Sequence, residues 1–270
     1  MTKTKVEKRV ELKNPHLEKL LDDKLYHFGM NKLNFDFEKN FGDVKYVCTG
    51  GSASRFEMYA KAFAEETDLK CSENLSHSDR FVMYKTGPVL WVNHGMGTPS
   101  MSIMLNETLK LLHYAKATDV CFFRIGTSGG VGVQPGTVII SNGAINGALE
   151  ECHILYVNGK LIKHPAVLDA VLSQELFDTA KDLGITAAYG KTLCADDFYE
   201  GQMRLDGAFC DYNEEDKFSF LRTLKDKGVC NIEMEATGFA SITHRAGVRG
   251  NRSFFGVLRH DEIVYQIGNH

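Results

Sequence analysis

The segment DVCFFRIGTSGG, residues 119–130, carries the strongest structural signal in the chain. Its first part, Asp119 to Ile125, is apolar enough to form a central β-strand that is buried on both faces. The polar, glycine-rich sequence that follows predicts a loop at the C-terminal end of this strand, where α/β proteins place their ligand sites. Arg124 stands at this boundary. Because a buried guanidinium group is costly without a negative partner, the sequence predicts either a bound anion or an internal salt bridge there.

Strand-like and helix-like segments alternate on both sides of this strand, which predicts an α/β domain built in layers. The other predicted strands cover residues 44–48, 89–94, 137–141 and 187–194. The predicted helices cover residues 56–66, 98–114, 169–183, 214–227 and 235–245. Asn158-Gly159 predicts a β-hairpin, because this dipeptide favours the tight turn between two antiparallel strands. A chain of 270 residues is most simply one large domain.

Composition and charge exclude several classes of protein. The net charge of −4 and the lack of a basic block beyond residues 3–9 argue against a nucleic-acid groove. No apolar run is long enough to span a bilayer, and the N-terminus lacks the apolar core of a secretory signal. The seven cysteines are scattered without a CxxC pair, which predicts reduced thiols in a cytoplasmic protein. No His, Cys or carboxylate cluster has the spacing of metal ligands, so no metal site is expected.

A second glycine-containing loop, residues 50–55, joins the strand at 44–48 to the helix at 56–66. Its glycines permit close backbone approach, and the N-terminus of the helix adds positive potential, so the loop could hold an anion. Gly51 and Arg55 are the candidate residues. A plain turn is the alternative.

The segment FYEGQMRLDG, residues 198–207, contributes a different chemistry. Gln202 and Arg204 offer an amide and a guanidinium group two residues apart, which suits the edge of a flat ring that carries two carbonyl groups. A solvated loop is the alternative. Together with the anion-binding loops, this segment suggests an enzyme that handles both a phosphate and a pyrimidine-like base.

The segment NIEMEA, residues 231–236, lies where a predicted strand ends and a predicted helix begins. Glu233 and Glu235 bracket Met234, so a carboxylate there could accept hydrogen bonds from vicinal sugar hydroxyl groups while the thioether lies against a ring. The alternative is a helix N-terminus with favourable acids. His27, in a short apolar segment, is either a structural or a functional residue.

These motifs together resemble those of the nucleoside phosphorylase superfamily, and within it those of the animal uridine phosphorylases. The pattern Phe-Tyr-Glu-Gly-Gln-x-Arg-Leu-Asp-Gly is specific to the uridine branch. The resemblance extends from about Leu25 to about Gly250. It implies an α/β fold, a single-domain three-layer α-β-α sandwich with a mixed central sheet. Residues 1–24 would be an N-terminal extension and residues 25–270 the catalytic domain.

The resemblance gives each candidate residue a role. In this family, phosphate would be held by Gly51, Arg55, Arg124 and Thr127, with Arg80 reaching it from the neighbouring subunit. The uracil ring would be held by Gln202 and Arg204, with Phe198 stacking on the base. The ribose would be held by Met234 and Glu235, with Glu233 in a less certain role. His27 would contact the ribose 5′-hydroxyl group across a dimer interface.

The implied reaction is the reversible phosphorolysis of uridine to uracil and α-ribose-1-phosphate. Phosphate itself attacks the anomeric carbon, so the reaction needs no metal and no organic cofactor. Arg124, Arg204 and Gln202 would be the residues that carry the chemistry. The family also implies a homodimer with shared active sites.

Residues 251–270 depart from the family pattern and form an atypical tail, in which Ser253 to Leu258 could still form a strand. A missing central strand would open the base pocket. The tail therefore leaves a second hypothesis, a non-catalytic or regulatory isoform that binds nucleoside. A third is a related phosphorylase for thymidine or a purine nucleoside, although Gln202 and Arg204 count against purines.

Overall fold

The computed structural model describes residues 8–10, 12–248, 254–257 and 264–265. The chain divides into two compact units. The first consists of Met1–Gly95, Pro99–Phe123 and Ile242–Asn251, and the second of Met96–Thr98, Arg124–Ser241 and Arg252–His270. The division into an extension, residues 1–24, and a catalytic domain, residues 25–270, stays a prediction.

The first unit is built around a group of strands whose order is β6-β3-β5-β4. These strands are β3 (Tyr46–Gly50), β4 (Met83–Thr86), β5 (Val89–Asn93) and the beginning of β6 (Cys121–Thr127). β3 and β5 run parallel, and β4 runs antiparallel to β5. The small antiparallel pair β1 (Lys24–Leu25) and β2 (Met30–Asn31) precedes them, together with the short helices η1 (Leu17–Lys19) and α1 (Phe37–Phe41).

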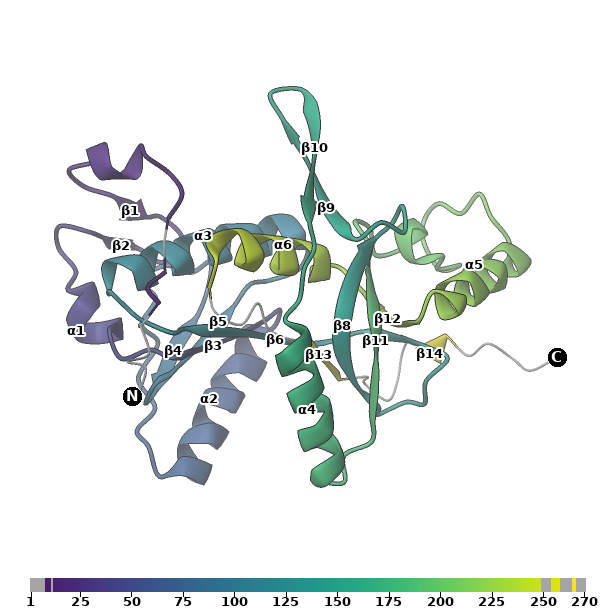
Figure 1. Cartoon of the computed structure of the whole chain (residues 1–270), viewed down its shortest axis with the longest axis horizontal. Helices are drawn as coiled ribbons and strands as arrows, with labels where there is room; N and C mark the ends of the chain where they lie inside the picture. Colours follow the sequence, from purple (N-terminus) through teal and green to yellow (C-terminus); the bar gives the residue numbers. More distant parts are fainter. Residues whose placement is uncertain (1–7, 11, 249–253, 258–263, 266–270) are drawn as a thin grey trace, which may run out of the picture. The chain divides into compact units, whose positions relative to one another are not determined.

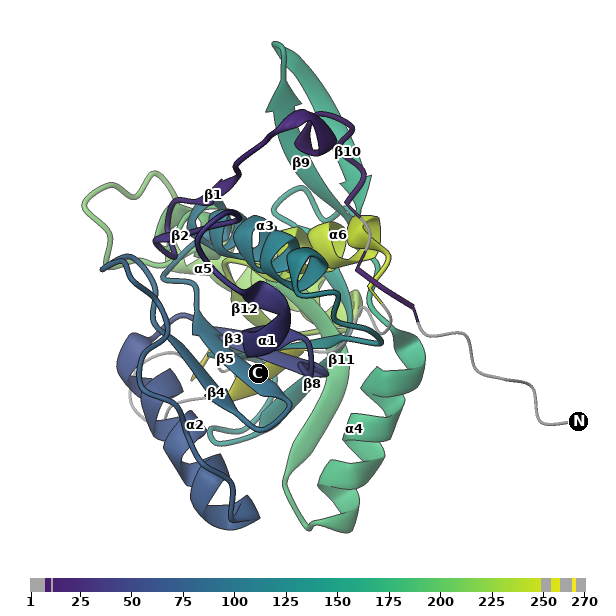
Figure 2. The ribbon, with the colours of Figure 1, turned by 90° about the vertical axis from the view of Figure 1, so that its left-hand side faces the viewer.

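Two longer helices cover the two faces of these strands: α2 (Ala53–Thr67) lies on one side and α3 (Thr98–Tyr114) on the other (Figures 1 and 2). α2 forms because Ser52 caps its first turn and because Phe56, Ala60 and Ala64 recur every four residues on its buried face. The hydroxyl group of Thr86 on β4 donates to the carbonyl oxygen of Ala60, which ties α2 to the strands.

The second unit contains strands in the order β14-β7-β12-β11-β8-β13, followed by the end of β6. They are β7 (Gly129–Val131), β8 (Val138–Asn146), β11 (Ala187–Cys194), β12 (Val229–Glu233), β13 (Phe254–Val257) and β14 (Val264–Tyr265). β8, β11 and β12 run parallel to one another, whereas β13 is antiparallel to β8 and β7 is antiparallel to β12. The sheet is therefore mixed, as the fold class requires.

Helices pack against these strands as well. α4 (Ala170–Asp182) packs on β8 and β11, and α5 (Glu214–Asp226) packs on β12 and β7. Leu193 of β11, Ile232 of β12 and Leu221 of α5 belong to one buried apolar cluster. α6 (Ala236–Ala246) begins here, and η2 (Glu200–Gln202) precedes α5. The hairpin of β9 (Cys152–Val157) and β10 (Lys160–Pro165) projects at the top of Figure 1 and forms its own two-stranded sheet.

The predicted α/β class with a mixed sheet is confirmed, and most predicted elements are present. The strand predicted at 187–194 and the helix predicted at 98–114 have the expected bounds, and Asn158-Gly159 forms the turn of the predicted hairpin. The strand predicted at 137–141 extends to Asn146. Thr98 is the first residue of α3, and its hydroxyl group donates to the Met234 carbonyl oxygen.

The atypical tail supplies a strand. β13 pairs in parallel with β6, where Phe254 lies opposite Arg124, and antiparallel with β8, where Val257 lies opposite Val138. The strand predicted between Ser253 and Leu258 is thus confirmed for residues 254–257, whereas Ser253 and Leu258 themselves lie outside the described residues. The described part of the chain therefore has a strand between β6 and β8.

Candidate active site

Arg124 in the second unit is held between two carboxylates. It lies on β6 with only 3% of its surface exposed. One terminal nitrogen of its guanidinium group is 2.7 Å from Oε2 of Glu233, and the other pairs with Glu235. The internal salt bridge, one of the two alternatives that the sequence left open, is therefore present. It joins a predicted phosphate ligand to two residues predicted to bind ribose.

The two carboxylates are fixed by backbone groups as well as by Arg124. Glu233 ends β12 and accepts hydrogen bonds from the N–H groups of Glu235 and Ala236, at 2.9 and 2.8 Å, where α6 begins. Glu235 accepts a hydrogen bond of 2.5 Å from the N–H group of Gly97. This arrangement leaves Met234 at the turn between strand and helix, partly exposed. The alternative of favourable acids at a helix N-terminus is thus realised by Glu233.

Burial raises the pKa of Glu233, and the nearby charge of Glu235 acts in the same direction. The charge of Arg124 and the two backbone N–H groups oppose this shift without cancelling it. The physical cause is that a carboxylate removed from water loses more solvation than one shared guanidinium group returns. One cation between two acids leaves the cluster short of positive charge, which favours the protonated form of Glu233.

The predicted base-binding residues lie in one compact turn of the second unit. Asp197 accepts hydrogen bonds from the N–H groups of Tyr199 and Gly201, at 2.6 and 3.1 Å, and these bonds shape the turn around η2. The hydrogen bond from Gly201 is the largest of the effects that lower the pKa of Asp197. Gln202 is buried, with 3% of its surface exposed. The alternative of a fully solvated loop therefore does not describe Gln202.

Arg204 is held flat at the end of this turn. Its Nε and one terminal nitrogen donate to the two carboxylate oxygens of Asp206, at 3.0 and 2.7 Å. The guanidinium carbon lies 4.4 Å from the centre of the Phe198 ring, at the distance of a cation–π contact. The structure thus brings Phe198 and Arg204 together and fixes the orientation of the guanidinium plane.

A buried hydrogen-bond chain, which the sequence did not reveal, supports the loop after β6. The side-chain amide of Asn231 donates to the hydroxyl group of Ser128 at 3.0 Å, and Thr192 donates to Asn231 at 2.8 Å. Ser141 lies 2.5 Å from Thr192 at the other end of the chain. Gly129, which the sequence assigns to an open loop, instead begins β7. Thr127 is the last residue of β6 and is partly exposed.

The first unit contains the remaining predicted residues. A Cβ atom at Gly51 would lie 2.9 Å from the carbonyl oxygen of Gly95, so close backbone approach explains this glycine. Arg55 lies in the first turn of α2. Arg80 is 72% exposed, and its Nε is 3.9 Å from the carboxylate of its neighbour Asp79. Gly51, Arg55 and Arg80 are therefore placed at the surface or at a helix start, and their ligand stays a prediction.

His27 in the first unit is bound to Glu107, a residue that is not among the predicted site residues. Nδ1 of His27 is 2.7 Å from Oε1 of Glu107, and the imidazole ring lies beside Phe81. A signal for Glu107 was available: it is an acid three residues after Met104 and four before Leu111, so it falls on the apolar face of the helix. A charged residue there needs a partner.

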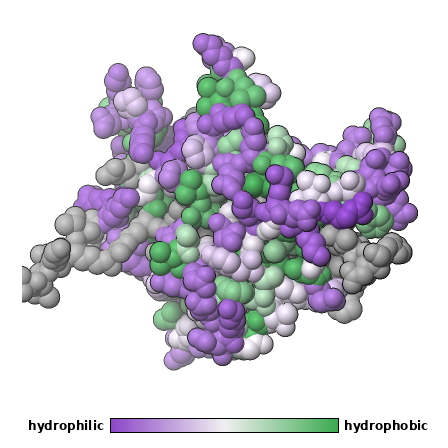
Figure 3. Space-filling model, turned by 45° about the vertical axis from the view of Figure 1, so that its right-hand side comes forward, coloured by the Kyte–Doolittle hydropathy of each residue, from purple (hydrophilic) through white to green (hydrophobic). Residues whose placement is uncertain are grey.

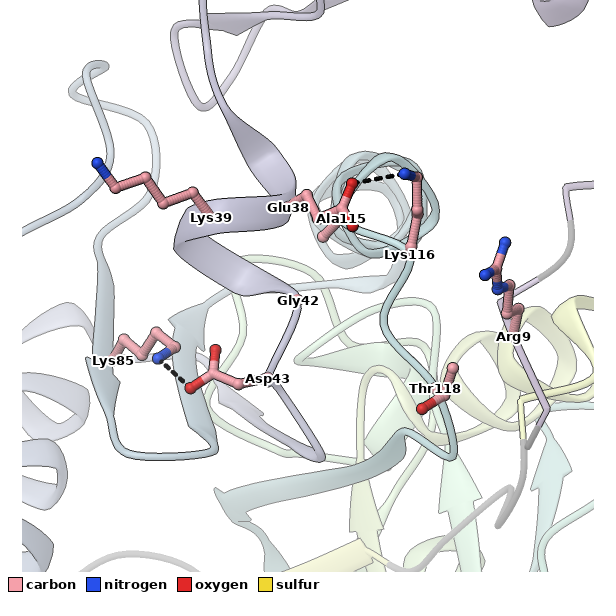
Figure 4. Close-up of a pocket in the computed structure, with 9 residues that line it drawn as sticks. All are labelled: Arg9, Glu38, Lys39, Gly42, Asp43, Lys85, Ala115, Lys116 and Thr118. Atoms are coloured by element: carbon pink, nitrogen blue, oxygen red, sulfur yellow. Dashed lines mark hydrogen bonds and ion pairs between the residues drawn. The ribbon is translucent and has the colours of Figure 1, made fainter. Parts of the chain in front are cut away.

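A separate hollow in the first unit, of about 560 Å³, contains none of the predicted site residues (Figure 4). Its basic side chains come from four different segments, but Figure 4 shows Arg9 and Lys39 far apart and directed away from one another. Lys85 and Lys116 form ion pairs of 2.8 and 2.6 Å with acids. Because the positive charges do not converge, this hollow is not a candidate active site.

Within the described residues there is no group of three or more His, Cys, Asp or Glu side chains arranged to hold a metal ion. Over the same residues, every helix is too short or too polar to cross a bilayer. All seven cysteines lie in the described part of the chain, and none forms a disulfide.

A family model described as the phosphorylase superfamily matches residues 45–259. The chain belongs to the phosphorylase superfamily. A relative named uridine and thymidine phosphorylase, from Caenorhabditis elegans, is 59% identical over 225 residues, which is 83% of this chain and 76% of the relative. Uridine phosphorylase 1 of Mus musculus is 44% identical over 246 residues, which is 89% of this chain and 79% of the relative.

The fold agrees with that of solved members of this branch. The crystal structure of uridine phosphorylase from Schistosoma mansoni in complex with uracil has a TM-score of 0.86 and 41% sequence identity. The match covers 91% of this chain and 86% of that chain. The resemblance to the uridine phosphorylases that the sequence predicts is therefore confirmed.

We predict that Glu233 makes the stability of the chain fall as the pH rises. Because its pKa is raised in the folded state, the folded chain binds the proton more tightly than the unfolded chain between the ordinary pKa of glutamate and the raised value. The ionised form that appears above this range opposes folding. In urea unfolding at several pH values, the stability of the wild type relative to Glu233→Gln should decrease as the pH rises.

The exposed residue Glu66, changed to Gln, is the matched control and should show no such trend. A stability advantage of the wild type over Glu233→Gln that grows with pH would contradict this assignment, because it would mean that pairing with Arg124 outweighs the loss of solvation.

Proposed function

We propose that the chain catalyses the reversible phosphorolysis of uridine to uracil and α-ribose-1-phosphate, in pyrimidine nucleoside metabolism. The observation that carries the proposal is the turn at residues 198–207, where Asp206 holds the Arg204 guanidinium group beside the Phe198 ring. This turn has the sequence pattern of the uridine branch, in a chain that is 59% identical to a relative named uridine and thymidine phosphorylase.

The turn supplies what the departing uracil needs. Negative charge grows on the base as the glycosidic bond breaks, and a preorganised guanidinium group stabilises such charge because it need not reorient during the reaction. Arg204 takes this role. Gln202 binds the carbonyl edge of the ring, and Phe198 stacks on the base. Gln202 and Arg204 thereby contact both carbonyl groups of a pyrimidine, an arrangement that disfavours a purine.

The cluster around Arg124 supplies the other half of the reaction. Arg124 and Thr127 bind phosphate in the second unit, and Gly51, Arg55 and Arg80 are the proposed phosphate ligands of the first unit. Glu235 accepts hydrogen bonds from the ribose hydroxyl groups, with Met234 against the sugar and Glu233 supporting both. Phosphate attacks the anomeric carbon through an oxocarbenium-like state, as in other glycosyl transfers. Holding phosphate in line with that carbon lowers the entropic cost of attack.

This proposal requires neither a metal ion nor an organic cofactor, because phosphate is the nucleophile and a co-substrate. We place the reaction in the cytoplasm.

Thymidine is the second candidate substrate, because the relative from Caenorhabditis elegans carries both substrates in its name. No observation favours the non-catalytic alternative. That alternative depended on the loss of a central strand, and β13 occupies the position between β6 and β8.

A homodimer is part of the proposal, with Arg80 and His27 serving the partner's site. The hairpin β9–β10 supports it with an exposed apolar surface, which Figure 3 shows below a polar tip. Leu155, Tyr156, Val157 and Leu161 are exposed there. Large apolar side chains grouped on a projecting element are typical of an interaction surface, and the mass of the chain in solution tests this proposal.

The purified chain should release uracil from uridine only when phosphate is present, because phosphate is the proposed nucleophile. Uracil release, followed by chromatography with and without phosphate, tests this. Thymidine and inosine complete the panel: cleavage of thymidine would support it as the second substrate, and inosine should remain uncleaved. Folded protein that releases no uracil, or that prefers inosine, would refute the proposed reaction.

Arg204→Ala should reduce the kcat for uridine by about 100- to 1,000-fold, the usual loss when one donor to a developing negative charge is removed. Phosphate affinity, measured by calorimetry, should stay nearly constant because Arg204 serves the base. Arg222→Ala, which removes an exposed arginine from α5, is the matched control. Equal losses of turnover and phosphate affinity in Arg204→Ala would contradict this division of roles.

A further inference from the structure

Glu107 is a buried carboxylate whose hydrogen-bonding capacity is directed at one short segment. It lies on α3 with 8% of its surface exposed. Its oxygens accept from the backbone N–H groups of His27, at 2.9 and 3.1 Å, and of Phe28, at 3.2 Å, as well as from the His27 ring. Among the residues described, no Lys or Arg lies within ion-pair distance of it. Hydrogen bonds from residues 27 and 28 therefore offset the cost of its burial.

The contact with Glu107 decides which nitrogen of His27 carries the proton. A carboxylate can only accept, so Nδ1, 2.7 Å from Oε1, must be the N–H donor. In the neutral ring Nε2 is then an acceptor, and the tautomer is fixed by the bond that the other nitrogen makes. The His27 side chain is 37% exposed, and none of the described residues hydrogen-bonds Nε2. Glu107 thus holds the ring through Nδ1, and Nε2 is available to accept a hydrogen bond from a ligand.

We infer that Glu107 is a positioning residue, which holds His27 in the Nδ1–H form so that Nε2 accepts a hydrogen bond from the 5′-hydroxyl group of the nucleoside. The inference rests on the proposed function, in which His27 meets that hydroxyl group. Glu107 itself touches no substrate. It acts by orienting the imidazole ring and by excluding the tautomer in which Nε2 would be a donor.

The variant Glu107→Gln tests this with little change in shape. Its one amide oxygen can still accept from the two backbone N–H groups, whereas its NH₂ group then faces Nδ1 and favours the opposite tautomer. The kcat/KM for uridine should fall about 3- to 10-fold, the value of one ordinary hydrogen bond. The kcat/KM for 5′-deoxyuridine, which lacks the hydroxyl group, should change less than about twofold by the same reasoning.

His27→Ala should show the same selective loss, and adding Glu107→Gln to it should cost nothing more, because the two residues act as one unit. Equal losses for both nucleosides, or losses that add in the double variant, would overturn the inference and leave Glu107 as a support of the backbone turn. Full retention of uridine activity in Glu107→Gln would overturn it too. Glu66→Gln is the matched control and should match the wild type.

Nitrogen NMR of the wild type tests the inference without a measurement of enzymatic activity. In alkaline buffer, where imidazole is neutral, the His27 signals should show a protonated Nδ1 and a bare Nε2, with the assignment made by their loss in His27→Ala. A protonated Nε2 would overturn the inference. Absence of phosphate-dependent uracil release would instead refute the proposed function, so the two failures are distinguishable.

Discussion

Arg124 places a full positive charge in a part of the second unit where 3% of its surface reaches solvent, and Glu233 and Glu235 both pair with it. A buried charge of this kind persists only when ionic partners and hydrogen bonds replace the lost water. β6 provides the guanidinium group, and the turn from β12 to α6 provides both carboxylates. The proposed phosphate and ribose side of the candidate site in this unit depends on that pairing, because it fixes β6 against the start of α6.

The same pairing explains why Glu233 and Glu235 behave differently. Glu233 is committed to structure, because it caps α6 through two backbone N–H groups and its pKa is raised by burial. Glu235 has one bond to Arg124 and one to the N–H group of Gly97, so it stands nearer to a role in ligand binding. In the proposed reaction, Arg124 therefore pairs both with Glu235, which binds the ribose, and with the phosphate that attacks the ribose. Its charge is divided between the two.

Local patterns predicted much of the fold, because helical periodicity and turn residues act over short distances. The helix at 98–114 and the turn at Asn158-Gly159 are examples. β4 and β7 were not predicted; β7 begins with two glycines and is defined by its pairing with β12 and β14, which are distant in the sequence. For the site, the sequence identified Arg124, Glu233 and Glu235 but could not choose between an anion and a salt bridge. Glu107 was missed because its partner, His27, is 80 residues away in the chain.

The most direct test of the divided role of Arg124 is phosphate binding to Glu235→Gln, measured by calorimetry against the wild type and Glu66→Gln. The substitution removes the negative charge of Glu235 beside Arg124, and with it the repulsion between that carboxylate and phosphate. Phosphate should bind roughly 3- to 10-fold more tightly to Glu235→Gln, which corresponds to about 1 kcal/mol, while uridine should bind more weakly. Weaker phosphate binding in this variant would contradict the divided role of Arg124, because it would show that Glu235 does not compete with phosphate for the charge of Arg124.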